Sequence, residues 1–146
     1  GIFFAVQHAT YDLLTEKEYT EFGRAYDLPI LESVDDLWLN MAHLHGDNIM
    51  FDLAADYPVS ILNWHDRETS PSLTTGLTKY PGIVCGGITR IETMVLGTSE
   101  DVKAEAKHAI EETNGQRLIL GTGCVLPLTT PYGNILAARK TAEELG

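Results

Sequence analysis

A chain of 146 residues that is 44% hydrophobic and 21% charged is long enough to bury the core of one domain, and it has no tract typical of disorder. Its formal net charge of -11 argues against nucleic acid and anionic membranes as partners, because proteins that bind them present basic surfaces. No stretch reads as a membrane span or a signal peptide. With two cysteines that show no disulfide pattern, we expect a cytoplasmic protein.

Five apolar runs read as strands, and each is followed by a stretch in which apolar residues recur at helical spacing. In chain order the predicted strands are residues 2–6, 37–44, 59–64, 82–85 and 118–120. The runs are continuous rather than alternating, which is typical of parallel strands covered on both faces. The sequence therefore predicts an α/β fold, a single domain over residues 1–146 with about five parallel strands and helices outside the sheet.

Helix signals stand between the predicted strands. Thr15 with Glu18 three residues later is a capping-box pattern, and Pro29 is expected to interrupt the helix that begins there. Thr130 and Pro131 suit the first positions of the last helix. The aromatic residues expected on the inner face of the first helix are Tyr19, Phe22 and Tyr26. Further helices are predicted over 48–57, 70–79, 98–114 and 131–145.

Reactive side chains gather at the carboxyl ends of the predicted strands, which lie along one edge of a parallel sheet. His43 and His45 are two residues apart, so an extended chain places both imidazoles on one face. With a thiolate from Cys124, at a neighbouring strand end, they match a zinc site that leaves a fourth position open. The alternative is that one histidine is a hydrogen-bonded core residue and the other faces solvent.

Other strand ends carry weaker signals. Cys85 lies within an apolar run and is predicted to be a core residue. Gly86 and Gly87 indicate that a ligand or another segment approaches the backbone closely, with a plain turn as the alternative. Arg67, in the polar cluster 65–68, suits an anionic group unless the cluster is simply a solvated loop.

Several of these stretches resemble the C-terminal half of the uroporphyrinogen decarboxylase superfamily, which also contains zinc-dependent methyltransferases that use methyl-corrinoid substrates. The run ILNW over 61–64 resembles the strand that ends in Asp-Trp, and residues 86–88 resemble the Gly-Asn-Leu turn. GTGCVLP over 121–127, with Thr130-Pro131 and Asn134, resembles the last strand, glycine turn and helix start. The resemblance covers nearly the whole chain and implies the C-terminal part of a (β/α)8 barrel.

The resemblance implies two competing activities. The methyltransferases hold zinc with a His-x-Cys pair and a later Cys; His43-x-His45 falls on the first motif, with histidine replacing cysteine, and Cys124 falls on or beside the second. This implies zinc-dependent methyl transfer from a corrinoid-type donor to a thiol. The decarboxylases carry a histidine where this chain has Thr122, a departure that counts against the alternative, a lyase reaction on uroporphyrinogen III in tetrapyrrole (heme) biosynthesis.

The chain begins inside an apolar run and without a methionine, so it is expected to be a fragment of a longer protein. The resemblance implies that the essential aspartate and tyrosine of the decarboxylases lie in the half that is absent. An open half-barrel exposes sheet edges, so we expect self-association or pairing with the missing N-terminal half, and an inactive isolated fragment. A non-catalytic cofactor-binding α/β module is a further alternative. The residues expected to bind a tetrapyrrole, corrinoid or thiol substrate are Gln7, Asn63, Arg67, Gly86, Gly87 and Thr122.

Overall fold

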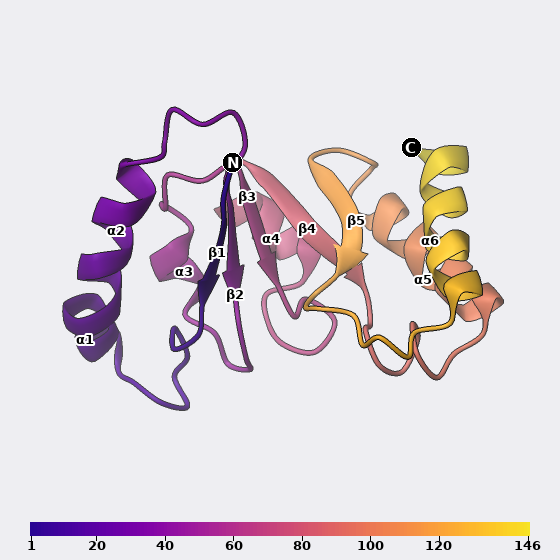
Figure 1. Ribbon diagram of the computed structural model, residues 1–146, viewed down its shortest axis with the longest axis horizontal. Coiled ribbons are helices and arrows are strands. Elements are labelled where there is room, and N and C mark those ends of the chain that lie inside the picture. The colour runs from indigo at the N-terminus through magenta and orange to yellow at the C-terminus, as the bar shows by residue number, and fades with distance from the viewer.

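The computed structural model describes residues 1–146 and contains one sheet of five parallel strands, which are neighbours in the same order as along the chain (Figure 1). The strands are β1 (Phe3–Val6), β2 (Met41–Leu44), β3 (Ile61–Trp64), β4 (Ile83–Ile88) and β5 (Leu118–Thr122). The predicted α/β fold with five parallel strands alternating with helices is confirmed. Because each strand pairs with the next one along the chain, β1 and β5 form the two edges of the sheet.

The helices are α1 (Glu16–Tyr19), α2 (Ala25–Glu32), α3 (Phe51–Ala54), α4 (Leu73–Lys79), α5 (Ser99–Glu112) and α6 (Tyr132–Leu145), with a π-helical turn η1 (Thr20–Arg24) joining α1 to α2. Figure 1 shows α3 and α4 behind the sheet, with α1 and α2 on one side of it and α5 and α6 on the other. None of these helices has the length and apolar character needed to cross a membrane.

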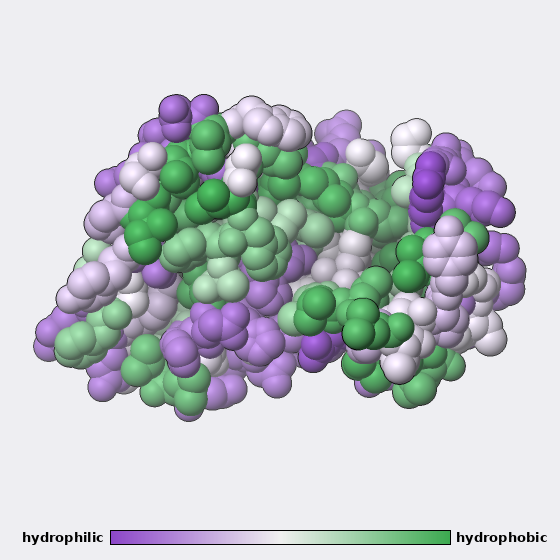
Figure 2. Space-filling view, viewed as in Figure 1, coloured by the Kyte–Doolittle hydropathy of each residue, from purple (hydrophilic) through white to green (hydrophobic).

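The main core lies between the sheet and these helices. It contains Leu44, Leu62 and Val84 from the strands, packed with buried helix residues such as Leu31 and Leu73. The prediction that helices cover both faces of the sheet is wrong, because the opposite face is partly exposed: Phe3 is 63% and Ile119 39% exposed. Apolar surface is visible on this open face in Figure 2. The continuous apolar runs arise because both faces carry apolar residues, although only one is covered.

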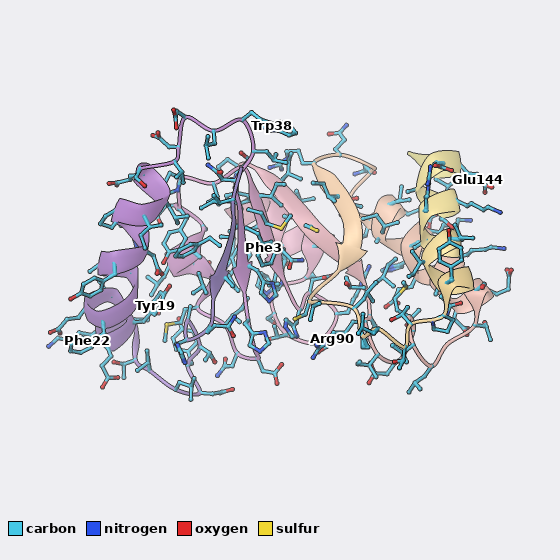
Figure 3. All side chains as sticks on the ribbon, viewed as in Figure 1. Phe3, Tyr19, Phe22, Trp38, Arg90 and Glu144 are labelled. Atoms are coloured by element: carbon cyan, nitrogen blue, oxygen red, sulfur yellow. The ribbon has the colours of Figure 1, made fainter.

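The π-helical turn explains two errors in the first helix. Tyr19 is buried as predicted, but Phe22 and Tyr26 are 68% and 67% exposed, and Phe22 lies at the outer edge of the molecule (Figure 3). A π-helical turn fits an extra residue into the helix, which rotates the residues after it away from the face that Tyr19 occupies. Pro29 lies inside α2 and does not end it, because the helix beyond it is held by the fully buried Leu31.

Several strand and helix boundaries in the structure differ from the predicted ones, where the sequence signals were ambiguous. The predicted strand over 37–44 begins only at Met41, and Trp38 is 84% exposed. Residues 48–57 contain only the short α3. The helix predicted over 70–79 begins later, at Leu73, with Ser72 as its N-cap.

Some of the helix caps predicted from the sequence are present in the structure, and others are not. The capping boxes at Thr15 and Thr98 are present. Thr130 is not the N-cap of α6, because its hydroxyl donates to the Pro127 carbonyl oxygen at 2.8 Å. Pro131 takes the N-cap position instead, without a side-chain hydrogen bond.

Candidate metal centre

A row of side chains crosses the open face of the sheet at one level. The register pairs Ala5 with His43, His43 with Asn63, Asn63 with Cys85, and Cys85 with Ile119. Successive residues of a strand alternate between faces, and paired residues of neighbouring strands point the same way. The row therefore places an imidazole, an amide and a thiol on the face that the helices leave open.

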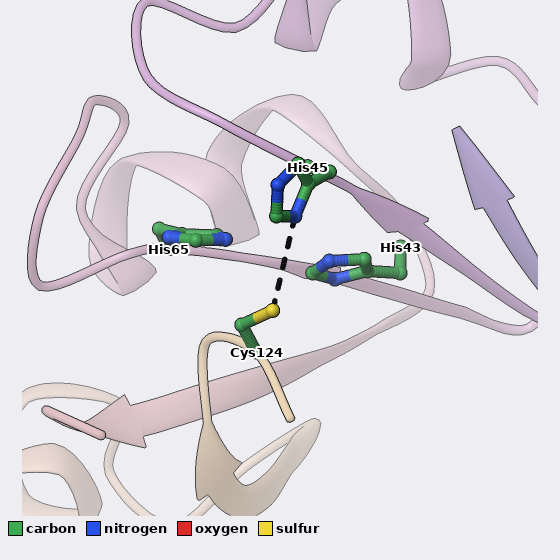
Figure 4. A group of neighbouring side chains, drawn as sticks. All are labelled: His43, His45, His65 and Cys124. Atoms are coloured by element: carbon green, nitrogen blue, oxygen red, sulfur yellow. Dashed lines mark hydrogen bonds between the residues drawn. The ribbon is translucent and has the colours of Figure 1, made fainter. Parts of the chain in front are cut away.

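Four side chains that could hold a metal ion meet at this row, as Figure 4 shows: His43, His45, His65 and Cys124. One possible ligand atom from each lies within 4.8 Å of the others. His43 lies in β2 and His45 directly follows it, whereas His65 and Cys124 follow β3 and β5. The structure thus brings together the three predicted ligands and adds His65, which sequence reasoning had placed only in a polar cluster.

Hydrogen bonds determine which nitrogen of His43 is free. The Asn63 amide nitrogen donates to the carbonyl oxygens of Cys85, at 2.8 Å, and Thr122, at 3.1 Å. The Asn63 amide oxygen therefore faces His43, whose Nδ1 lies 2.6 Å away. Because that oxygen only accepts, His43 Nδ1 carries the proton, and the lone pair is on Nε2. Metal-binding histidines are commonly oriented by such a partner.

His65 has a buried nitrogen with no partner. Its side chain is 5% exposed, and its Nδ1 lies 3.2 Å from Oε2 of Glu68. A carboxylate accepts, so the Nδ1 proton points to Glu68 and the lone pair is on Nε2. His65 Nε2 is buried and makes no hydrogen bond. Leaving a buried polar atom unsatisfied costs roughly 1–3 kcal/mol, which a metal ion at the centre would offset.

Cys124 reaches the histidines through a tight turn after β5. Its Sγ lies 3.8 Å from Nδ1 of His45, the contact dashed in Figure 4. The Thr122 hydroxyl donates to the Cys124 carbonyl oxygen at 2.6 Å and holds the turn. A Cβ on Gly123 would lie 2.6 Å from the Trp64 carbonyl oxygen and from the Cα of His65. Only glycine lets the Cys124 turn pass this close to the backbone beside His65.

Burial controls the protonation of these groups. Desolvation is the largest cause that lowers the pKa of His43 and of His45, and the neighbouring His65 adds to it. Both imidazoles are therefore biased toward the neutral form that binds metals. Burial raises the pKa of Cys85 to about 11, so this thiol stays protonated at neutral pH. Cys85 is half-buried and lies outside the group of four.

The donor set fits a zinc ion. Zinc binds imidazole nitrogen at about 2.0–2.1 Å and thiolate sulfur at about 2.3 Å, so tetrahedral ligand atoms lie about 3.3–3.6 Å from one another. The separation of 3.8 Å between His45 Nδ1 and Cys124 Sγ is close to that value. Small side-chain adjustments bring the other donors, which lie within 4.8 Å, into the same range.

A cavity of about 610 Å³ opens beside the centre. It is lined by three of the predicted substrate-binding residues, Gln7, Asn63 and Thr122, together with apolar side chains that include Phe3 and Val125. No lysine or arginine lines it. The cavity therefore suits an uncharged or apolar portion of a ligand.

The other three predicted substrate-binding residues do not line this cavity. Gly86 and Gly87 lie inside β4 rather than in a turn after it, and a Cβ on Gly86 would collide with the Asp66 carboxylate. Arg67 Nε donates to the Gly87 carbonyl oxygen at 2.9 Å, and its Nη2 pairs with Glu112 at 2.6 Å. The close approach inferred from the two glycines is thus made by protein segments: Asp66 lies against Gly86, and Ala109 of α5 lies where a Cβ on Gly87 would be.

Comparison with known proteins identifies a matching family and a solved structure with a similar fold. A family profile described as uroporphyrinogen decarboxylase (URO-D) matches residues 2–145. The chain is similar to a solved methyltransferase from Methanosarcina mazei, with a TM-score of 0.81 and 22% sequence identity; the match covers 97% of this chain and 42% of that chain. The chain thus spans less than half the length of that methyltransferase. No curated protein matches.

Proposed function

The chain belongs to the uroporphyrinogen decarboxylase family, and from this premise we propose that it carries the metal centre of a zinc-dependent methyltransferase. The reaction would move a methyl group from a corrinoid-type donor to a small thiol. One observation carries the proposal: donor atoms of His43, His45 and Cys124 meet at the carboxyl ends of two strands, β2 and β5. The solved methyltransferase supports the proposal because this chain resembles part of it in fold.

The residues of the chain have separate tasks in this reaction. Zinc at this centre would lower the pKa of a bound thiol and hold it as the nucleophilic thiolate. Asn63 fixes the His43 ring with its Nε2 lone pair free. Thr122 holds the turn that presents Cys124. Phe3 and Val125 contribute apolar surface to the cavity wall, which suits an apolar part of a ligand.

The bonds that form and break are those of a nucleophilic substitution at the methyl carbon. The thiolate sulfur forms a bond to that carbon while the cobalt–carbon bond of the donor breaks. The electron pair of the broken bond remains on cobalt, and the thiol proton has already passed to solvent. No oxidant or reductant is consumed.

Decarboxylation of uroporphyrinogen is the second candidate, favoured by the family match alone. Such a substrate carries many carboxylates and needs cationic partners. The cavity has no lysine or arginine in its wall, and the Arg67 guanidinium is already paired with Glu112. These features make methyl transfer the better supported activity.

Elemental analysis of the purified chain tests the metal centre. We expect about one zinc per chain, lost when Cys124 is changed to alanine and kept when Cys85, the other cysteine, is changed in the same way. Methyl transfer is then assayed on the longer parent protein, with methylcobalamin and a panel of small thiols. Turnover of uroporphyrinogen by that parent without bound zinc would overturn the proposal.

A further inference from the structure

We propose that His65 is the fourth metal ligand of this centre and that Glu68 is the positioning residue that holds it. The inference rests on the metal-binding part of the proposed function and goes beyond it: His65 would complete four ligands in the free protein, and a substrate thiol would bind as a fifth. The resemblance of the sequence to zinc methyltransferases points to residues at 43, 45 and 124 but to none at 65. The assignment therefore depends only on the surroundings of this imidazole.

The imidazole of His65 lies against both other histidines. Its ring centroid is 5.8 Å from that of His43, in a stacked arrangement, and 5.3 Å from that of His45, edge to face. All three rings surround the space that the Cys124 sulfur enters (Figure 4). The Nε2 atom of His65 is the one buried imidazole nitrogen in the chain without a hydrogen-bond partner. A metal ion in that space would give it one.

Glu68 sets the orientation of this ring. The backbone N–H groups of Glu68 and Thr69 both donate to the His65 carbonyl oxygen at 2.8 Å, which folds residues 65–69 into a tight turn. The turn brings Oε2 of Glu68 to 3.2 Å from Nδ1 of His65. The Nδ1 proton is thereby committed to the carboxylate, and Nε2 keeps its lone pair toward the other donors. A carboxylate behind a metal-binding histidine also raises the basicity of the ligand.

Arg90 supports the carboxylate from its other side. Its Nε lies 3.9 Å from Oε1 of Glu68 and makes no hydrogen bond of its own. Figure 3 places Arg90 among the loops at the carboxyl ends of the strands. The Glu68 side chain is 33% exposed, and the arginine offsets the cost of holding its charge there. The chain His65–Glu68–Arg90 thus links the metal centre to the loop after β4.

The fourth ligand changes the charge of the centre. Three neutral imidazoles and one thiolate leave a divalent ion with a single net positive charge, whereas a centre with two thiolates is neutral. Replacing a thiolate by an imidazole strengthens the pull of the ion on the electrons of a bound group. His45 already stands where the family carries that cysteine, so His65 would add a fourth ligand to a centre that is more electrophilic than one with two thiolates.

Metal titrations of the whole chain test this assignment without an activity assay. Cobalt(II) serves as the probe, because its visible absorption is intense when four ligands surround it and weak when six do. Wild type should show the intense spectrum and a thiolate-to-cobalt band. His65→Ala should keep the thiolate band but shift the visible bands of cobalt, because water replaces an imidazole as the fourth ligand, and should bind zinc more weakly than wild type. Glu68→Gln should keep the spectrum and bind zinc 10- to 100-fold more weakly, as is typical when a group that orients a ligand is removed.

His8→Ala is the matched control, since His8 is exposed and lies outside the group of four. His65→Gln, which keeps polar volume at the site, replaces the alanine variant if circular dichroism shows that the latter does not fold. Wild-type zinc affinity and an unchanged cobalt spectrum in a folded His65 variant would overturn the assignment. The metal would then have three protein ligands. A wild-type chain that binds no metal would instead overturn the proposed function.

Discussion

Nδ1 of His43 lies 2.6 Å from the amide oxygen of Asn63, its register partner on the neighbouring strand. The amide is itself held by the carbonyl oxygens of Cys85 and Thr122, which belong to the next two strands. A single asparagine therefore ties four strands together at the level of the metal centre. It also determines which nitrogen of His43 is available to a metal.

Asn63→Ala should lower zinc affinity 10- to 100-fold, because it removes the group that orients His43. It also removes the two hydrogen bonds that the amide donates to the carbonyl oxygens of Cys85 and Thr122, each of which contributes roughly 0.5–1.5 kcal/mol to stability. Competition with a chelator measures the affinity, and urea unfolding measures the stability. Asn40→Ala is the control, because Asn40 is equally buried and its amide bonds to Ile2 and Val34 lie away from the centre. Equal losses of zinc affinity in both variants would contradict this role.

Cys85 should react slowly with alkylating agents at neutral pH. Burial raises its pKa to about 11 from the usual 9.0, and a difference of about two units lowers the thiolate fraction at pH 8 about 100-fold. In a Cys124→Ser variant, which leaves Cys85 as the single thiol, the rate of reaction with iodoacetamide should keep rising up to about pH 11. A rate that levels off near pH 9 would show an ordinary thiol.

Gly123→Ala should abolish tight zinc binding. The added methyl group would lie 2.6 Å from the Trp64 carbonyl oxygen, so the turn must move and carry Cys124 away from His45. Zinc stoichiometry and melting temperature are the measurements. Gly133→Ala serves as the control, because the nearest atom to an added Cβ there is the Ser99 hydroxyl at an ordinary 3.6 Å. Full zinc occupancy in Gly123→Ala would refute the tight packing of this turn.

The isolated chain should self-associate or need further protein to cover its sheet. Strands β1 and β5 are unpaired edges, and Phe3 and Ile119 on the open face are 63% and 39% exposed. Unpaired strand edges with apolar neighbours readily recruit other chains. Light scattering after size-exclusion chromatography should give a mass well above 16.1 kDa. A monodisperse monomer at micromolar concentration would argue against this expectation.

The sequence alone determined the features that depend on neighbours in the chain. The predicted capping box at Thr15 needs only a partner three residues away, and it is present. The alternation of a strand placed His43 and His45 on one face, and the structure brings them together. Apolar runs separated by helical spacing predicted five parallel strands, because hydrophobic periodicity reports local structure directly.

Tertiary structure decided everything that depends on contacts between distant segments. Pro29 remains inside a helix because packing of Leu31 holds the turn beyond it. Gly86 leaves room for the Asp66 carboxylate and Gly87 for Ala109 of α5, rather than for a ligand. His65 joined the centre because sheet register and the narrow turn at Gly123 bring β3 and β5 ends together. The distances between residues far apart in the chain cannot be read from sequence spacing, because strand pairing and loop packing set them.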